Sequence, residues 1–179
     1  HSSAASDVYK RQVLSHAPRR VQSMRMMIDA YAPEGVTELA VDSIFMMPHL
    51  GVLSQINEQA ATEVFDRDCI VYLGTVVAPV GRPPDGKPVL EVSMTMPDGS
   101  TVSEKLPSME MRRYAVGVGE HAEATITPLA GNLDVGAGPG KKWTGKLRGG
   151  VVGVIIDTRG RPILVPEDAG VRVPLLRKW

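Results

Sequence analysis

The chain has 179 residues, of which 43% are hydrophobic and 22% are charged, a composition typical of a globular protein with one domain or two small ones. Its 20 basic and 20 acidic residues give a formal net charge of +0, and only 4% of its residues are aromatic. A general nucleic-acid surface, a base-stacking platform and a membrane-binding surface are therefore not expected. No apolar run approaches the ~18 residues that a membrane helix needs, and no signal peptide is apparent.

Cysteine and histidine usage gives no sign of a metal or catalytic centre. The single cysteine, Cys69, cannot form an internal disulfide, which fits a reducing, cytoplasmic setting. An apolar run follows Cys69 directly, so a buried core thiol is the preferred interpretation. The four histidines are scattered, and none forms a ligand pair of the H-x-x-x-H type. The sequence therefore predicts neither a metal site nor a catalytic residue.

Residues 1–12 differ in character from the rest of the chain. They end in the hexapeptide DVYKRQ, which looks like the translation of a transposon mosaic-end adapter used in library preparation. The first residue is also His1 rather than methionine. We interpret residues 1–12 as a non-native, adapter-like segment that packs against nothing, and we expect the native protein to continue upstream.

Residues 13–68 are predicted to form an α/β segment that is too small to be complete. Apolar residues recur at helical spacing after Pro18, which suits the first turn of a helix. A short strand is predicted over residues 37–43, followed by helices over 45–56 and 57–66. Because the segment lacks the sheet that these helices would cover, we expect their methionine-rich faces to be exposed or to drive self-association. The methionines concerned are Met24, Met27, Met46 and Met47.

Residues 69–179 are predicted to form a separate, mainly antiparallel β-domain, either a sandwich or a barrel. Apolar residues alternate with period two in residues 89–96 and 101–106, which indicates a β-hairpin around the turn at 97–100. Together with the preceding helices, this gives an α+β fold class. Further strands are predicted over residues 69–80, 111–118 and 122–128.

The most definite structural signal lies near the end of the chain. Residues 151–156, VVGVII, form a short β-branched run between turn signals, which is typical of a buried strand. The Asp-x-x-Gly turn at residues 157–160 then leads to a second apolar piece at 163–165, so we expect a hairpin. We predict that the strand at 151–156 is fully buried.

A glycine-rich loop at residues 136–140 precedes this strand. Between the loop and the strand lies a basic run without acidic residues. The spacing does not match a phosphate-binding loop, which needs G-x-x-x-x-G-K-[ST] at the start of a helix. We therefore interpret residues 136–148 as a basic, solvent-facing hairpin loop rather than an anion site. The basic residues are Lys141, Lys142, Lys146 and Arg148.

Three long stretches resemble one family. They read VLSHAPRR with PEGVTELAVDSIFMMPHLGVLS, then RDCIVYLGTVVAPVG, then LDVGAGPGK with GGVVGVIIDTRGRPILVPED. Together they resemble the C-terminal part of the accessory protein of coenzyme-B12-dependent glutamate mutase, the GlmL or MutL-like family. This family is unrelated to the mismatch-repair protein that shares the name MutL. The resemblance covers nearly everything from Val13 onward.

The resemblance implies an actin-like ATPase related to the hydantoinase and oxoprolinase group, so residues 13–68 would be the end of its ATPase lobe. The implied role is ATP-driven upkeep of the mutase, such as exchange of damaged cobalamin. The parent protein would use ATP and Mg²⁺, and its partner would be a B12-dependent mutase. The family's phosphate-binding hairpin, of the Asp-Ile-Gly-Ser-Thr type, is absent from this chain. The chain itself is therefore expected to be inactive and to bind no cofactor.

Two residues are candidates for the nucleotide site of the parent protein. The resemblance places a Gly-Gly motif for the adenosine side immediately before Val13, so Ser15 and His16 would sit beside that pocket. In the alternative interpretation, Ser15 only caps the helix that starts near Pro18.

Three functions remain open at this point. The first is the C-terminal part of an ATPase-type accessory protein. The second is a non-catalytic interaction module, in which the β-domain contacts a partner. The third, a fragment of a hydantoinase-like enzyme acting on a cyclic amide, is weakest because no catalytic constellation is apparent.

Overall fold

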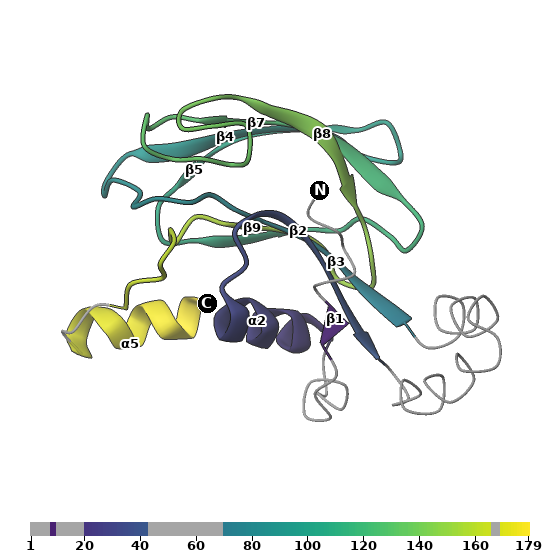
Figure 1. Ribbon diagram of the computed structural model, residues 1–179, viewed down its shortest axis with the longest axis horizontal. Coiled ribbons are helices and arrows are strands. Elements are labelled where there is room, and N and C mark those ends of the chain that lie inside the picture. Colours follow the sequence, from purple (N-terminus) through teal and green to yellow (C-terminus); the bar gives the residue numbers. More distant parts are fainter. Residues whose placement is uncertain (1–7, 10–19, 43–69, 166–168) are drawn as a thin grey trace, which may run out of the picture.

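The computed structural model describes residues 8–9, 20–42, 70–165 and 169–179, which fold into two β-sheets and two helices (Figure 1). In chain order the elements are β1 (Val8–Tyr9), α2 (Arg20–Tyr31), β2 (Gly35–Asp42), β3 (Ile70–Ala78), β4 (Pro88–Thr95), β5 (Thr101–Pro107), β6 (Met111–Tyr114), β7 (His121–Pro128), β8 (Trp143–Arg148), β9 (Gly153–Asp157) and α5 (Ala169–Lys178).

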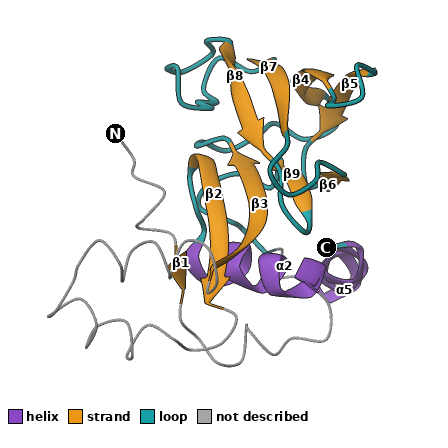
Figure 2. Cartoon of the chain, turned by 90° about the vertical axis from the view of Figure 1, so that its right-hand side faces the viewer, coloured by secondary structure: helices purple, strands orange, loops and turns teal. Residues whose placement is uncertain are grey.

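The two sheets lie face to face and form a β-sandwich (Figures 1 and 2). One sheet has the strand order β1-β2-β3-β9-β6 and mixes parallel and antiparallel pairs. The other, β5-β4-β7-β8, is antiparallel throughout. Figure 1 shows α2 and α5 on the side of the five-stranded sheet that faces away from the four-stranded sheet. The described residues are mostly β with few helices, which agrees with the expected α+β class, and of the two expected architectures, sandwich or barrel, they form the sandwich.

Side-chain alternation explains how the four-stranded sheet packs. In β7 the side chains of Ala122, Ala124 and Ile126 are buried, while those between them face outward. This period of two is typical of a sheet with one face on the core and one face in water. The core between the sheets also takes Val92, Met94, Leu147, Val154 and Ile156.

Strand β9 is buried along its whole length, which confirms the predicted burial for residues 153–156, whereas the prediction is wrong for the exposed Val151. It pairs with β3 in parallel and with β6 antiparallel, so it lies inside the five-stranded sheet. Val154 and Ile156 face the sandwich core, whereas Ile155 faces the core under α2. A strand covered on both faces has no polar side, which explains the continuous apolar run. The strand begins at Gly153, and Val151 is 44% exposed.

Helix α2 packs its apolar stripe on the five-stranded sheet. Met24, Met27 and Ile28 are fully buried against a surface that includes Leu39 of β2 and Leu73 of β3. The expectation that Met24 and Met27 would be exposed is therefore wrong. The sheet on which α2 packs includes β3 and β9, which lie beyond residue 69.

The position of β2 bears on the expected division between residues 13–68 and 69–179. β2 pairs with β3 along its whole length, from Gly35 opposite Ala78 to Asp42 opposite Ile70. The described residues on both sides of the division thus share one sheet and one core. The helices expected over 45–56 and 57–66, with Met46, Met47 and Cys69, lie outside the described residues.

Other local expectations need correction. Residues 143–148 form strand β8 rather than part of a loop, and the residues expected as a strand at 163–165 form no strand. The strand expected over residues 111–118 is shorter, because β6 ends at Tyr114. Val8 and Tyr9 pair in parallel with β2. The expectation that residues 1–12 pack against nothing is therefore wrong for these two residues.

Candidate functional site

The two residues proposed for the adenosine side, Ser15 and His16, lie outside the described residues, so the structure does not place them. Among the described residues, no group of three or more His, Cys, Asp or Glu side chains could hold a metal ion. None of the helices described here is long and apolar enough to span a membrane. The glycine-rich loop and the buried charges are the remaining candidates for a site among the described residues.

The backbone of the glycine-rich loop is held by a carboxylate of the chain itself. One oxygen of Asp134, Oδ1, accepts hydrogen bonds from the amides of Gly136 at 2.8 Å and Gly138 at 3.0 Å. The amide of Gly140 donates to the carbonyl of Leu133 at 2.8 Å. An anion-binding loop needs amides that point at the ligand. Here Asp134 already occupies that position, which supports the loop interpretation over a phosphate site.

The glycines of this loop make room for a tryptophan. A Cβ atom on Gly145 would lie 2.8 Å from the indole ring of Trp143, and one on Gly136 would lie 3.7 Å from it. Gly136 also has a φ of 140°, which side-chain-bearing residues rarely adopt. The glycine pattern is thus explained by the packing of Trp143 against the sandwich core.

Replacing Asp134 by Ala is expected to lower the free energy of unfolding by about 1–2 kcal/mol, because two amides lose a charged acceptor. Urea unfolding followed by circular dichroism measures this loss. The controls are Lys141→Ala and Lys142→Ala, whose side chains are exposed and which should change stability by less than about 0.5 kcal/mol. Equal losses in all three variants would contradict the assignment of Asp134 as the anchor of the loop.

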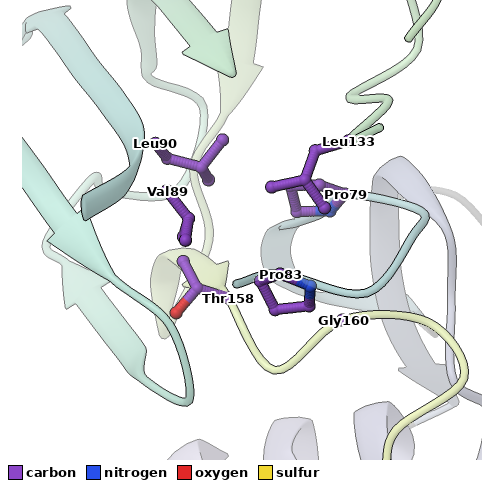
Figure 3. Close-up of a pocket in the computed structure, with 7 residues that line it drawn as sticks. All are labelled: Pro79, Pro83, Val89, Leu90, Leu133, Thr158 and Gly160. Carbon is purple, nitrogen blue, oxygen red and sulfur yellow. The ribbon is translucent and has the colours of Figure 1, made fainter. Parts of the chain in front are cut away.

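The described part of the chain has hollows of different character. One is an apolar space under the turn after β9, too narrow to admit a water molecule (Figure 3). It is lined by Pro79, Pro83, Val89, Leu90, Leu133, Thr158 and Gly160. Another is an open depression of about 400 Å³ on the outer face of the four-stranded sheet. It is lined by Ser93, Thr95, Glu123, Ala124, Thr125, Thr144, Gly145 and Lys146.

The most concentrated polar chemistry lies at the end of β9, where the sequence Asp157-Thr158-Arg159-Gly160-Arg161 is buried. The side chain of Asp157 is 0% exposed and those of Arg159 and Arg161 are 2% and 1% exposed. Arg159 donates to both oxygens of Asp157, from Nε to Oδ1 at 3.0 Å and from Nη2 to Oδ2 at 2.9 Å. Arg161 Nη2 donates to Oδ2 at 3.0 Å. We call these three residues the Asp157 cluster.

The Asp157 cluster ties several parts of the fold together. Arg159 Nη1 donates to Asp29 Oδ1 of α2 at 2.9 Å, and the Asp29 side chain is 60% exposed. Arg161 Nε donates to the carbonyl of Pro33, between α2 and β2, at 2.9 Å. A bidentate arginine–carboxylate pair of this kind fixes geometry strongly. The cluster therefore anchors α2 and the start of β2 on the end of β9.

A second polar network closes the sandwich where β5 and β6 meet. Arg112 donates to Glu104 at 3.2 Å and to Glu110 at 2.9 Å, and the hydroxyl of Tyr114 donates to Glu104 at 2.5 Å. Lys178 donates to Glu110 at 2.7 Å. The Lys178 hydrogen bond is the main cause that lowers the pKa of Glu110, against the opposing effect of burial, and the bond from Arg112 adds to it. Burial, followed by the bond to Glu104, raises the pKa of Tyr114.

The sequence signal for these clusters is incomplete. The Asp-x-x-Gly turn at residues 157–160 predicts a hairpin, but it does not indicate that the charged side chains of this turn are buried. The signal that could have found them is the position of two arginines and one aspartate directly after a fully apolar strand. Buried charges of that kind must be paired.

Comparison with known proteins adds one finding. The family model described as MutL protein matches residues 12–69. This match supports the resemblance to the glutamate mutase-associated MutL family, and it includes α2 and β2 of the described structure. No curated protein and no solved structure matches the chain.

Proposed function

We propose that the chain is the C-terminal part of an ATPase-type accessory protein that maintains a coenzyme-B12-dependent mutase of the glutamate mutase type. The observation that carries this proposal is the match of the MutL protein family over residues 12–69. In the parent protein, ATP and Mg²⁺ would bind upstream of this chain, with Ser15 and His16 on the adenosine side. The strands from β3 onward would then follow the ATPase lobe, and β2 would belong both to the lobe segment and to the sandwich.

The contacts of the matched segment support a mechanical link between the two parts. Helix α2 and strand β2 lie inside the family match, and both are bound to the strands from β3 onward through the β2–β3 ladder and the Asp157 cluster. A displacement of α2 by nucleotide in the parent would therefore be transmitted to the sandwich as a rigid movement.

The chain by itself is expected to bind no ATP tightly. The phosphate hairpin of the family is missing, and the amides of Gly136 and Gly138 are already bonded to Asp134. Isothermal titration calorimetry with ATP and Mg²⁺ tests this on the 179-residue chain. A dissociation constant in the low micromolar range would show that nucleotide binding does not need the upstream motifs.

The partner is tested with a glutamate mutase directly. The mutase is immobilised with and without cobalamin, and the chain is passed over it in a biosensor. We expect saturable binding to at least one of the two forms. No binding by a chain that is folded, as judged by circular dichroism, would contradict a partner-contacting role for this part of the parent protein.

The second candidate, a non-catalytic interaction module, is favoured by the open depression on the four-stranded sheet. Its polar lining provides a surface for a partner without any catalytic set among the described residues. Thr125→Arg places a long charged side chain in the depression, and Lys142→Ala is the matched exposed control. If only the first variant weakens binding to the mutase, the depression is the contact surface. The upstream sequence of the parent protein separates the two candidates. An Asp-x-Gly phosphate hairpin there favours the ATPase, and its absence together with binding to the mutase favours the interaction module.

A further inference from the structure

The C-terminal end of α5 is bound at a corner between the β5–β6 connection and the turn after β9. The indole Nε1 of Trp179 donates to the carbonyl of Met109 at 2.9 Å. The guanidinium of Arg159 lies 4.9 Å from the centre of the Trp179 ring, within the range of a cation–π contact. The ammonium of Lys178 donates to Glu110 at 2.7 Å. Met109, Glu110 and Arg159 together are called the acceptor corner.

The acceptor corner is built by contacts that do not involve α5. The hydroxyl of Thr158 donates to the carbonyl of Pro107 at 2.7 Å, and the amide of Glu110 donates to the same hydroxyl at 3.0 Å. The backbones of Thr158 and Glu110 are also hydrogen-bonded, at 2.8 Å. Arg159 is held on its other side by Asp157. The corner is therefore preorganised, which reduces the cost of binding.

Met109 shows that this loop is held in an uncommon backbone conformation. Its φ is 63°, in the left-handed region that residues other than glycine rarely adopt. Backbone strain of this kind persists only where surrounding contacts impose it, and it concentrates at ligand-binding positions. Here the strained residue is the one whose carbonyl accepts the indole N–H.

The body of α5 is held much less firmly than its end. The side chains of Val171, Val173 and Leu176 are 50%, 41% and 50% exposed. The helix has ten residues and contains Pro174 in its interior, which removes one helical hydrogen bond. A helix this short is marginal in water without tertiary support.

We propose that the acceptor corner is a docking site for a protein segment that presents a cation followed by tryptophan, and that α5 is a displaceable latch occupying it. The corner matches that chemistry at three points. Glu110 faces the cation, the Met109 carbonyl faces the indole N–H, and the Arg159 guanidinium faces the ring. A partner segment of the same chemistry gains these contacts when it displaces α5. This inference does not depend on the proposed function.

The experiment uses the full chain and a fluorescent peptide with the sequence of residues 171–179, VRVPLLRKW. Fluorescence anisotropy measures peptide binding to the wild-type chain and to Trp179→Ala, in which the latch has lost its anchor. We expect Trp179→Ala to bind the peptide at least tenfold more tightly than the wild type, because the tethered latch competes at a millimolar effective concentration. A peptide with alanine in place of its tryptophan should bind at least tenfold more weakly.

Matched variants in the Trp179→Ala background separate the corner from the general surface. Glu110→Gln should weaken peptide binding about threefold, as expected for a partly exposed ion pair. Glu38→Gln, which removes the distant Arg148–Glu38 pair, should leave binding unchanged. Neither variant touches the Asp157 cluster, so both should fold, as circular dichroism can verify.

Three results would overturn the proposal. The first is a folded Trp179→Ala chain that does not bind the peptide. The second is equal affinity for the peptide and its alanine version, or equal effects of Glu110→Gln and Glu38→Gln. The third is a dimer of the wild-type chain in light scattering that Trp179→Ala abolishes, because the occupant would then be α5 of a second copy.

Discussion

Replacement of Asp157 by alanine is expected to be among the most destabilising single substitutions in the chain. The substitution leaves the guanidinium groups of Arg159 and Arg161 buried without the carboxylate that both of them contact. Breaking a buried ion pair by removing one partner costs about 3–5 kcal/mol. A domain of ordinary stability has only about 5–15 kcal/mol in total. Thermal and urea unfolding, followed by circular dichroism, measure the loss.

Asp29→Ala is the matched control for this prediction. It removes the other carboxylate that Arg159 contacts, but the Asp29 side chain is 60% exposed, so water can replace it. We expect a loss of about 1 kcal/mol or less. If Asp157→Ala and Asp29→Ala cost the same, burial does not govern the energetics of the Asp157 cluster and the anchoring role assigned to it is wrong.

A further comparison separates charge from shape. Replacing a complete buried ion-pair group by apolar residues of similar volume is often neutral or stabilising in proteins. Introducing Arg159→Met and Arg161→Met together with Asp157→Leu should therefore be less harmful than Asp157→Ala alone. The contacts to Asp29 and Pro33 would still be lost, so we expect partial recovery.

The elements that the sequence predicted well are those whose pattern depends on neighbours close in the chain. The β4–β5 hairpin is such a case, because the turn at Pro97-Asp98-Gly99-Ser100 is stabilised by its own hydrogen bonds, including that of the Ser100 amide with Asp98 at 2.9 Å. The apolar stripe of α2 was predicted from its helical period, and the buried run of β9 from its β-branched residues between turn signals. In each case local residue types decide the structure.

The features that the sequence did not predict depend on long-range pairing. Nothing near β2 indicates that it pairs with β3, so a boundary was expected between them. Strand β8, with the sequence WTGKLR, carries a glycine and a lysine that resemble loop chemistry, but its pairing with β7 and the indole of Trp143 give it strand structure. The Asp157 cluster was not predicted, because the partners of its arginines, Asp29 and Pro33, lie over a hundred positions away.

The candidate nucleotide residues illustrate a different limit. Ser15 and His16 were proposed from the family resemblance, and their role stays a prediction because it concerns the parent protein. The role of Asp134 was not predicted either. The sequence shows an aspartate before a glycine-rich loop, but it does not show which amides that aspartate binds. Its geometry explains why the loop needs neither phosphate nor metal to hold its shape.

Replacement of Ile155 by aspartate is expected to be the other highly destabilising change. The Ile155 side chain is 2% exposed and packs in the core between the five-stranded sheet and α2. The substitution removes about 1.5–3 kcal/mol of apolar burial and also places an unpaired carboxylate in that core. A total loss of ~4–5 kcal/mol follows, which is at the upper end for single substitutions. Val151→Asp, at a position that is 44% exposed, should cost little.

Hydrogen exchange on the wild-type chain tests the same core position without any substitution. The amides of β9 belong to ladders with β3 and β6, so they should open only with global unfolding. Amides in residues 136–142 lie in an exposed loop and should exchange much faster. If Ile155 and its β9 neighbours exchange as fast as that loop, or if Ile155→Asp melts no lower than Val151→Asp, then β9 is not the central strand on which the two cores depend.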